Sequence, residues 1–172
     1  MNEICTRKVV SEMNDPTPEP HVSSIHIAPG SRLPMKPVQE VTLTAGKGLP
    51  GDRYENSRHR HVTIQSQTGL DQAAAALGAP IRPSATRRNI TISSGSVPDK
   101  PGQRMRIGTV QFEVVRIAAP CKLLDDAIGD GARSALRRRA GSVFRVLSGG
   151  TIRLQDSVDL LDSHSTEAGS TD

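Results

Sequence analysis

Apolar and polar residues alternate with a period of two through most of the chain, which is the pattern of half-buried β-strands. Glycine or proline stands in almost every connection between the alternating segments. The pattern predicts strands over residues 22–27, 38–43, 62–65, 89–93, 105–107, 109–117, 143–147, 152–154 and 157–161.

The longest predicted strand, 109–117, changes phase part-way along. Val110, Phe112 and Val114 share one face, whereas Val115 and the last apolar residue take the opposite phase. One extra residue near Val114 explains this shift, so we expect a β-bulge there. Bulges bend strands, and barrels require bent strands.

Three segments have features of helices instead. Residues 68–77 are rich in alanine and stop at Gly78, residues 131–140 have Asp130 as the predicted N-cap, and a shorter helix is expected over about 121–127. Strands outnumber helices, so the predicted class is mainly β (α+β). The predicted architecture is a closed or partly closed β-barrel decorated with a few short helices.

The ends of the chain differ from this patterned region. Residues 1–20 are polar and contain three prolines, and residues 163–172 are also polar, so both are predicted to be disordered tails around one domain, residues 21–162. The N-terminus lacks the apolar core of a secretory signal, and no segment approaches the roughly 18 apolar residues of a membrane span. With only two cysteines, these features favour a cytoplasmic protein without a membrane partner.

Composition narrows the chemistry of the predicted domain. The chain has no Trp, one Tyr and two Phe, so its core must consist of Val, Ile, Leu and Ala. It contains 22 basic and 18 acidic residues, but residues 1–20 hold two basic and four acidic ones, and residues 163–172 hold two acidic ones. Residues 21–162 therefore carry a net charge of +8. Most of the basic residues are arginines, which favour phosphate or carboxylate partners. Nucleic acid is disfavoured because single-strand binders stack bases on aromatic rings; a small phosphorylated ligand and a plain basic surface both remain open.

Cys121 stands in the stretch RIAAPCKLLDD, where the longest strand gives way to a helix. Pro120 keeps the preceding residue out of the helical region, and a helix that began at Cys121 or Lys122 would offer unpaired amides to an anion. A thiolate there can act as a nucleophile, a persulfide carrier or a soft metal ligand. The alternative is a small apolar filler of the core, which is the commoner role of a lone cysteine.

Two polar segments supply candidate anion contacts. In KGLPGDRY, residues 47–54, turn-forming residues precede an Asp-Arg pair, so that backbone amides and a guanidinium can face a phosphate. In TRRNITIS, residues 86–93, two arginines and an asparagine lead into a strand, where successive side chains face opposite ways. The alternatives are an ordinary hairpin loop and a basic strand end. The candidate residues are Asp52, Arg53, Arg87, Arg88 and Asn89.

A third candidate is a pair of histidines, His59 and His61, which share one face at the start of a strand. Two histidines can contribute to a metal site, but no third ligand is near in the sequence. We therefore expect a solvated pair.

Taken in order, these segments resemble the MOSC domain family, the module named after the C-terminal part of molybdenum cofactor sulfurases. The resemblance covers about residues 22–161 and depends on the order and spacing of short motifs. These are Gly51-Asp52-Arg53, HVTIQS before the alanine-rich helix, Arg87-Arg88-Asn89-Ile90, Gly102, Ile107-Gly108-Thr109-Val110, Pro120-Cys121 with Leu123-Leu124, GSVFRVLSGG from Gly141, and TIRLQDSVDLL.

The resemblance implies a β-rich, barrel-like fold. It also implies that Cys121 is the family's functional cysteine, which handles activated sulfur or coordinates molybdenum in the pterin cofactor. The residues implied as contacts to the pterin and its phosphate are Asp52, Arg53, Arg87, Arg88 and Asn89.

The chain departs from the fuller family pattern in two respects. Gln155 precedes Asp156 in the last turn, where the pattern usually has glycine, which puts the type of that turn in question. The sequence also lacks a desulfurase domain and a ferredoxin-like domain, so no pyridoxal phosphate is expected in this chain. Sulfur would come from a separate cysteine desulfurase or other donor, and electrons from a molybdoenzyme or reductase partner.

Three functions remain open at this point. The first is a sulfurtransferase or sulfur carrier, in which Cys121 is the nucleophile that carries a persulfide. The second is a module that binds the molybdenum-pterin cofactor, with Cys121 as a molybdenum ligand and oxo transfer supported by a separate reductase. The third is a non-catalytic basic binding module for protein or nucleic acid.

Overall fold

Strands account for more of the described protein than helices do. The computed structural model describes residues 18–161; residues 1–17 and 162–172, which hold most of both predicted tails, lie outside the described residues. The strands are β1 (Val22–Ile27), β2 (Lys36–Val38), β3 (Glu40–Leu43), β4 (Val62–Ser66), β5 (Ile90–Ile92), β6 (Arg104–Ile107), β7 (Val110–Ile117), β8 (Ser142–Ser148), β9 (Gly150–Arg153) and β10 (Val158–Leu161). The helices are α1 (Gln67–Leu77), the 3₁₀ helix η1 (Pro83–Thr86), α2 (Leu123–Ile128) and α3 (Ala132–Ala135).

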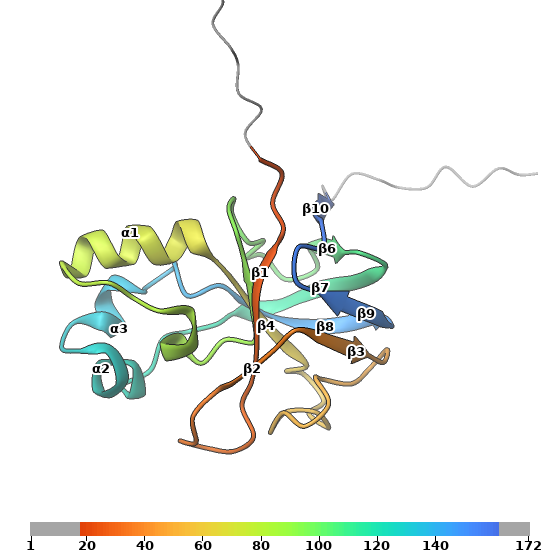
Figure 1. Ribbon diagram of the computed structural model, residues 1–172, viewed down its shortest axis with the longest axis horizontal. Coiled ribbons are helices and arrows are strands. Elements are labelled where there is room, and N and C mark those ends of the chain that lie inside the picture. Colours follow the sequence, from red (N-terminus) through yellow and green to blue (C-terminus); the bar gives the residue numbers. More distant parts are fainter. Residues whose placement is uncertain (1–17, 162–172) are drawn as a thin grey trace, which may run out of the picture.

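Eight strands form one mixed sheet in the order β10-β6-β7-β8-β4-β5-β1-β2 (Figure 1). Only β4 and β5 pair in parallel, which the crossover through α1 and η1 permits. The ladder does not close, since β10 and β2 are its edges. Its distant parts nevertheless meet where His21 and Ser157 form an isolated bridge and Val22 N donates to Asp156 O at 2.9 Å. The fold is therefore mainly β and partly closed, one of the two forms predicted.

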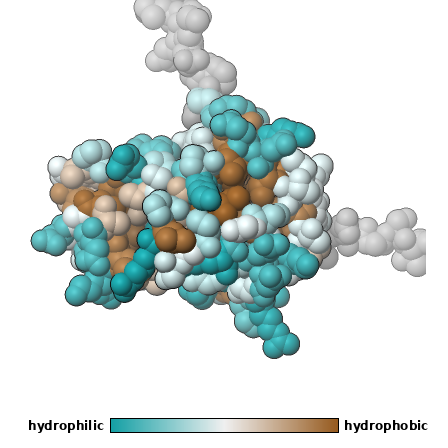
Figure 2. Space-filling model, turned by 60° about the horizontal axis from the view of Figure 1, so that its bottom comes forward, coloured by the Kyte–Doolittle hydropathy of each residue, from teal (hydrophilic) through white to brown (hydrophobic). Residues whose placement is uncertain are grey.

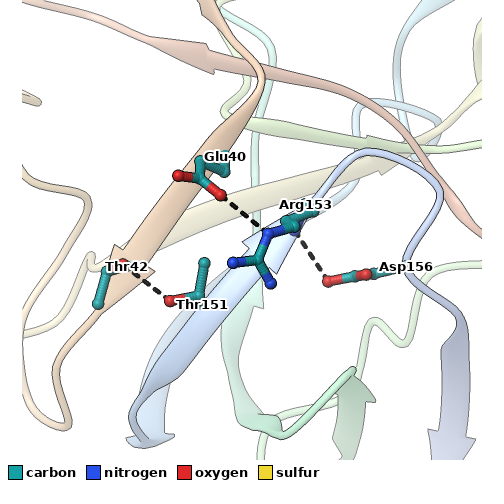
Figure 3. A network of polar contacts seen from close by, with 5 residues as sticks. All are labelled: Glu40, Thr42, Thr151, Arg153 and Asp156. Atoms are coloured by element: carbon teal, nitrogen blue, oxygen red, sulfur yellow. Dashed lines mark hydrogen bonds and ion pairs between the residues drawn. The ribbon is translucent and has the colours of Figure 1, made fainter.

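A separate two-stranded antiparallel sheet consists of β3 and β9. Across it, the Thr42 and Thr151 hydroxyls share a hydrogen bond of 2.9 Å, and Arg153 Nε pairs with Glu40 Oε2 at 2.9 Å (Figure 3). These contacts are exposed, so each contributes at most about 1 kcal/mol. The residues that hold this sheet on the main core are Val41, Leu43 and Ile152.

The turn after β9 contains Gln155 where the family pattern usually has glycine. Arg153 N donates to Asp156 Oδ2 at 2.8 Å, which closes the turn (Figure 3). Gln155 has φ 74°, the left-handed conformation that glycine adopts without strain. Gln155 thus takes the conformation expected of the glycine that the family pattern usually has.

The predicted bulge in the longest strand is confirmed. The register of β7 against β8 shifts between Val114 and Arg116, so that Val115 is the extra residue. Up to Val114 every second residue is buried, whereas Arg116 and Ile117 are exposed. The bulge thus turns the end of β7 out of the core, toward the segment that contains the cysteine.

One predicted strand, 38–43, is wrong as a single element. β2 ends at Val38 after pairing with β1, and β3 begins at Glu40 and pairs with β9. At the corner, Gln39 O accepts a hydrogen bond from Leu154 N at 3.2 Å, so the chain changes sheets within one residue. The alternation of apolar residues continues through the corner, which is why the sequence pattern does not reveal it.

The first predicted helix is confirmed as α1. Ser66 caps it, since its Oγ accepts a hydrogen bond from Gly69 N at 3.2 Å, and Gly78 ends it with φ 75°. Within residues 18–161, no helix has the length and apolar character needed to cross a membrane.

The helix predicted over 131–140 is much shorter in the structure. α3 ends at Ala135, and Arg138 has φ 63°, a left-handed conformation that a helix cannot contain. Asp130 is not the N-cap; Gly131 occupies that position with φ 91° and no side-chain cap is present. The chain therefore makes turns where the arginine-rich pattern predicts a last helical turn.

Two separate apolar clusters stabilise the molecule. The larger fills the barrel and contains Phe112 and Phe144, whose rings meet edge-on with centroids 6.1 Å apart. The smaller lies in the helical end, formed by α1, η1, α2 and α3, on the left of Figure 1. Figure 2 shows apolar surface over both halves, with hydrophilic residues between. The smaller cluster consists of Leu70, Ala73, Ile81, Leu124, Ala135, Leu136 and Ala140.

Candidate functional site

Cys121 is exposed at the junction between the barrel and the helical end. β7 ends at Ile117, and α2 begins only at Leu123, so the cysteine precedes the helix and does not lie in its first turn as expected. Leu124 N donates a hydrogen bond to the Cys121 backbone carbonyl at 3.0 Å, so this bond involves the backbone of the cysteine and not its thiol. Exposure excludes the alternative of a core filler. Because α2 has only six residues, its N-terminus is a weak source of positive potential.

Arg88 supports the cysteine segment from inside. Arg88 is only 6% exposed, and its Nε donates a hydrogen bond to Ala140 O at 2.9 Å. Its Nη2 donates to Ala118 O at 3.1 Å and, at 3.5 Å, to Ala119 O. One guanidinium therefore ties the backbone before Pro120 to the segment that follows α3. These contacts give Arg88 a positioning role.

Asp52 and Asn89 are joined to each other inside the protein. Asp52 Oδ2 accepts hydrogen bonds from Ala28 N at 2.8 Å and from Asn89 Nδ2 at 2.9 Å, and Oδ1 accepts from Tyr54 N at 2.9 Å. Asn89 Oδ1 accepts from Thr63 N at 3.0 Å. Both side chains are buried and hold the 47–54 loop against β1, β4 and β5. Their contact with a pterin stays a prediction.

Tyr54 contacts two arginines of different segments. The Arg53 guanidinium carbon is 4.6 Å from the centre of the tyrosine ring, and that of Arg60 is 4.1 Å away. Both distances are typical of cation–π contacts. The ring therefore brings two like charges close to each other.

Three guanidinium groups have buried nitrogens without a partner. Within the described residues, the Nε atoms of Arg53, Arg60 and Arg87 form no hydrogen bond. Arg87 is oriented by bonds from Nη1 to Leu33 O at 2.7 Å and from Nη2 to Gly30 O at 3.1 Å. No ion pair links these three arginines to an acidic residue among residues 18–161. These guanidinium groups therefore keep hydrogen-bonding capacity that the described residues do not use.

The positive charges act on one another. Burial lowers the pKa of Arg60; Tyr54 opposes this shift, and the like charges of Arg53 and Arg116 add to it. Burial and then the charge of Arg53 lower the pKa of Arg87. An anion placed among these residues would relieve the repulsion that lowers both values.

The same electrostatic effects connect the arginines to the thiol. Burial, followed by the charge of Arg60, lowers the pKa of Arg88 to about 10. A Cys121 thiolate acts in the opposite direction on the pKa of both Arg87 and Arg88. The thiol and both guanidinium groups are therefore within electrostatic range of each other. We call Arg53, Arg60, Arg87, Arg88 and Arg116, together with Tyr54, the arginine cluster.

The two histidines have different environments. His61 is 5% exposed, and its Nδ1 accepts a hydrogen bond from Val146 N at 2.9 Å, so the expected solvated pair is wrong for this residue. His59 is exposed. No group of three or more His, Cys, Asp or Glu within residues 18–161 could hold a metal ion. Molybdenum bound through Cys121 would thus take its other ligands from a cofactor.

Arg60 and Tyr54 are candidate site residues that sequence reasoning did not single out. Arg60 directly precedes His61 and β4, a segment in which every residue is buried. A charged residue just before a strand whose residues are all buried is a signal that could have identified it. Tyr54 is the chain's only tyrosine and follows a predicted arginine contact, which is a weaker signal.

The structure thus defines a class of protein: a partly closed, mainly β barrel whose exposed Cys121 thiol lies within electrostatic range of Arg87 and Arg88, which have no acidic partner among residues 18–161. The family model of the MOSC domain matches residues 38–159, and the chain belongs to the MOSC domain family. No curated protein matches the sequence at a significant level.

Solved structures share this fold at low sequence identity. The YuaD protein from Bacillus subtilis is 17% identical with a TM-score of 0.68, covering 81% of this chain and 94% of that one. YiiM from Geobacillus stearothermophilus is 18% identical with a TM-score of 0.63, covering 83% of this chain and 75% of its own. YiiM from Escherichia coli is 18% identical with a TM-score of 0.60, covering 83% and 70%. At such identities the likeness concerns the fold alone.

Proposed function

We propose that Cys121 accepts a sulfur atom as a persulfide and passes it to an acceptor. The observation that carries the proposal is the exposed thiol within electrostatic range of Arg87 and Arg88, which have no acidic partner among residues 18–161. Cationic surroundings and exposure are what a reactive cysteine needs, because the thiolate is the nucleophile. Arg88 ties the backbone before Pro120 to Ala140 and so positions the segment that leads to the thiol.

The transfer proceeds as a thiolate exchange. The Cys121 thiolate attacks the outer sulfur of a persulfide on the donor's cysteine. The bond between the two donor sulfurs breaks, the donor cysteine leaves as a thiolate, and Cys121 now carries the persulfide. Attack by an acceptor nucleophile on the outer sulfur then returns Cys121 as a thiolate. No oxidant is required, since a separate cysteine desulfurase supplies sulfur already at the sulfane level.

Intact-mass measurement tests this proposal. Incubation with a cysteine desulfurase and cysteine should add about 32 Da, one sulfur, to the protein. The chain has two cysteines, and only Cys121 is proposed to carry the persulfide. The adduct should therefore be lost in Cys121→Ser and kept in Cys5→Ser. Absence of an adduct on wild-type protein, or its survival in Cys121→Ser, contradicts the proposal.

A second candidate function is binding of a molybdenum-pterin cofactor, and the unpartnered Nε atoms of Arg53, Arg60 and Arg87 favour it. A terminal phosphate fits such donors, and each charged hydrogen bond would contribute about 1.5–3 kcal/mol. Cys121 would be a soft ligand of molybdenum. The bound group would supply oxo-transfer chemistry, while the protein residues would bind, orient and shield it.

Metal and pterin analysis distinguishes the two candidates. Protein purified from a host that makes the cofactor should contain molybdenum and pterin under the second candidate. Arg60→Gln should then lower the pterin content. The control is Arg106→Gln, which should not lower it, because Arg106 is an exposed arginine on β6 that pairs with Asp159 on the edge strand β10. Protein with a Cys121 adduct and without pterin supports sulfur transfer alone.

A further inference from the structure

A groove of about 630 Å³ lies directly against the cysteine segment. Its apolar part is formed by the residues between the bulge of β7 and Cys121, and its basic part by residues of α3 and the turns after it. The residues that matter are Ile117, Ala119 and Pro120 on the apolar part and Arg133, Arg137 and Arg138 on the basic part. We call this surface the basic groove.

The basic groove has an excess of positive charge. Arg133, Arg137 and Arg138 are exposed, and none forms an ion pair with another residue in the described range 18–161. The acidic residue of the groove, Asp125, is half-buried, and its Oδ1 accepts a hydrogen bond from Arg133 N at 2.8 Å. A smaller cavity of about 260 Å³ shares Ile117 and Arg138 and extends the basic lining.

The apolar part of the groove distinguishes it from a plain basic surface. Ile117 is 39% exposed, one of three large hydrophobic residues so exposed within residues 18–161. An apolar centre bordered by charged and polar residues is the anatomy of protein interfaces. No aromatic residue lines the groove, so bases of a nucleic acid would have no ring to stack on.

We propose that the basic groove docks an acidic segment of the protein that exchanges sulfur with Cys121. The proposal rests on the proposed function, because a persulfide moves only when the donor's sulfur reaches the Cys121 thiolate. A partner that places acidic side chains on the three arginines and an apolar one on Ile117 would hold its own cysteine beside Pro120 and Cys121. Opposite charge also raises the rate of such encounters.

A thiol-exchange rate measurement tests the docking. The probe is a short blocked peptide with one leucine and one cysteine among glutamates, its cysteine activated as a mixed disulfide with thionitrobenzoate. Release of thionitrobenzoate reports attack by Cys121 when the protein carries Cys5→Ser. We expect the acidic peptide to react about tenfold faster at low salt than the same peptide with glutamine for glutamate. High salt should bring the two rates together.

Matched variants locate the effect. Arg133→Glu/Arg137→Glu should bring the acidic peptide to the rate of the neutral one. Lys36→Glu/Lys100→Glu, which makes the same charge change at two exposed lysines outside the groove, should keep most of the advantage. Reaction with neutral dithiodipyridine should be unchanged in both, which shows that the fold and the thiol are intact. Equal rates for the two peptides on wild-type protein, or equal losses in the two variants, overturn the docking site.

Two further outcomes separate the docking site from its alternatives. The first uses two competitors, a single-stranded oligonucleotide and an acidic peptide without cysteine. If the oligonucleotide cancels the rate advantage of the acidic probe at the lower concentration, the groove is a nucleic-acid surface and the proposal is overturned. A persulfide adduct that forms on wild-type protein although the peptides react equally would leave the sulfur-transfer function standing and remove the docking site alone. A peptide advantage without any adduct would instead remove the sulfur-transfer function and, with it, the identity of the docked partner.

Discussion

Arg88 is buried yet has no carboxylate partner among residues 18–161. Desolvation opposes its charge and lowers its pKa to about 10, so the side chain is still protonated at neutral pH. Charge-assisted bonds to the Ala140 and Ala118 carbonyls, each contributing about 1.5–3 kcal/mol, offset that cost. Arg88 thus fixes the geometry of the segment before Cys121 through the same bonds that offset its burial.

Removing this guanidinium should destabilise the protein. Arg88→Met keeps the length of the side chain but leaves the Ala140 and Ala118 carbonyls without their donor, and we expect a loss of about 2–4 kcal/mol in the free energy of unfolding. Urea denaturation measures it, with Arg116→Met as the exposed control, expected to change stability by less than about 0.5 kcal/mol. Equal stabilities of the two variants would show that Arg88 does not support the segment.

His61 gives the stability of the fold a dependence on pH. Burial, then the charge of Arg145, lowers its pKa below the ordinary value of 6.5. As pH falls below 6.5, the unfolded chain binds a proton that the folded protein excludes, so the free energy of unfolding decreases. His61→Asn keeps an acceptor for Val146 N and removes the titration. Its unfolding free energy should therefore vary less than that of wild type between pH 7 and about pH 5; parallel curves contradict this assignment.

At the scale of elements, Gly141 determines how the helical end joins the sheet. A Cβ at this position would lie 1.9 Å from Ile64 O, in addition to the strain of φ 77°. The backbone of Gly141 also accepts the hydrogen bond from Ala118 N at 3.0 Å. Two connections of the barrel, before Cys121 and before β8, therefore depend on a close approach that only glycine allows.

Gly141→Ala should be far more harmful than an alanine at another left-handed glycine. Gly46 has φ 78° and nothing within 4 Å of an added Cβ, so Gly46→Ala should cost only the backbone strain of about 1–2 kcal/mol. Gly141→Ala should lose more than about 4 kcal/mol or fail to fold. Thermal and urea unfolding of the pair measure the difference, and similar losses would refute the close-contact explanation.

Sequence patterns predict strands here better than they predict corners and helix ends. Alternation identifies β7 and its bulge because burial of one face imposes a period of two. It misses the corner at Gln39, since the apolar pattern runs on while the hydrogen-bonding partner changes. The helix predicted over 131–140 fails because Arg138 is left-handed, and no local signal marks an arginine for that conformation.

The sequence predicts only some residues of the candidate site. Local chemistry identifies Cys121, Arg53 and Arg87, because each stands in a loop between predicted strands and helices. Arg60 joins them only through the fold, by stacking on Tyr54 from a segment that precedes another strand. Contacts between distant segments of this kind are fixed by packing and not by any local pattern.

For the molecule as a whole, two cores of unequal size have a consequence for Cys121. The barrel cluster is held by long strand ladders, while the helical end depends on a few apolar residues and on helices as short as six and four residues. Helices of that length are unstable alone and depend on tertiary packing. Cys121 lies between the two, so motion of the helical end would move the thiol without disturbing the barrel.

Weakening the smaller core should therefore loosen one part of the molecule first. Leu136 is fully buried in it, and Leu136→Ala should cost about 2–5 kcal/mol. Hydrogen–deuterium exchange should rise in α1, α2 and α3 while amides of β4, β7 and β8 stay protected. A uniform rise across both parts would show that the two clusters unfold together.

The contact of Tyr54 with Arg53 and Arg60 also has a spectroscopic consequence. The chain has no tryptophan and a single tyrosine, so its ultraviolet-excited emission originates almost entirely from this one ring. An anion that enters the arginine cluster and pulls either guanidinium off the ring changes the quenching of that emission. The protein thus carries an intrinsic fluorophore at its candidate site, and binding of phosphate can be followed without any label.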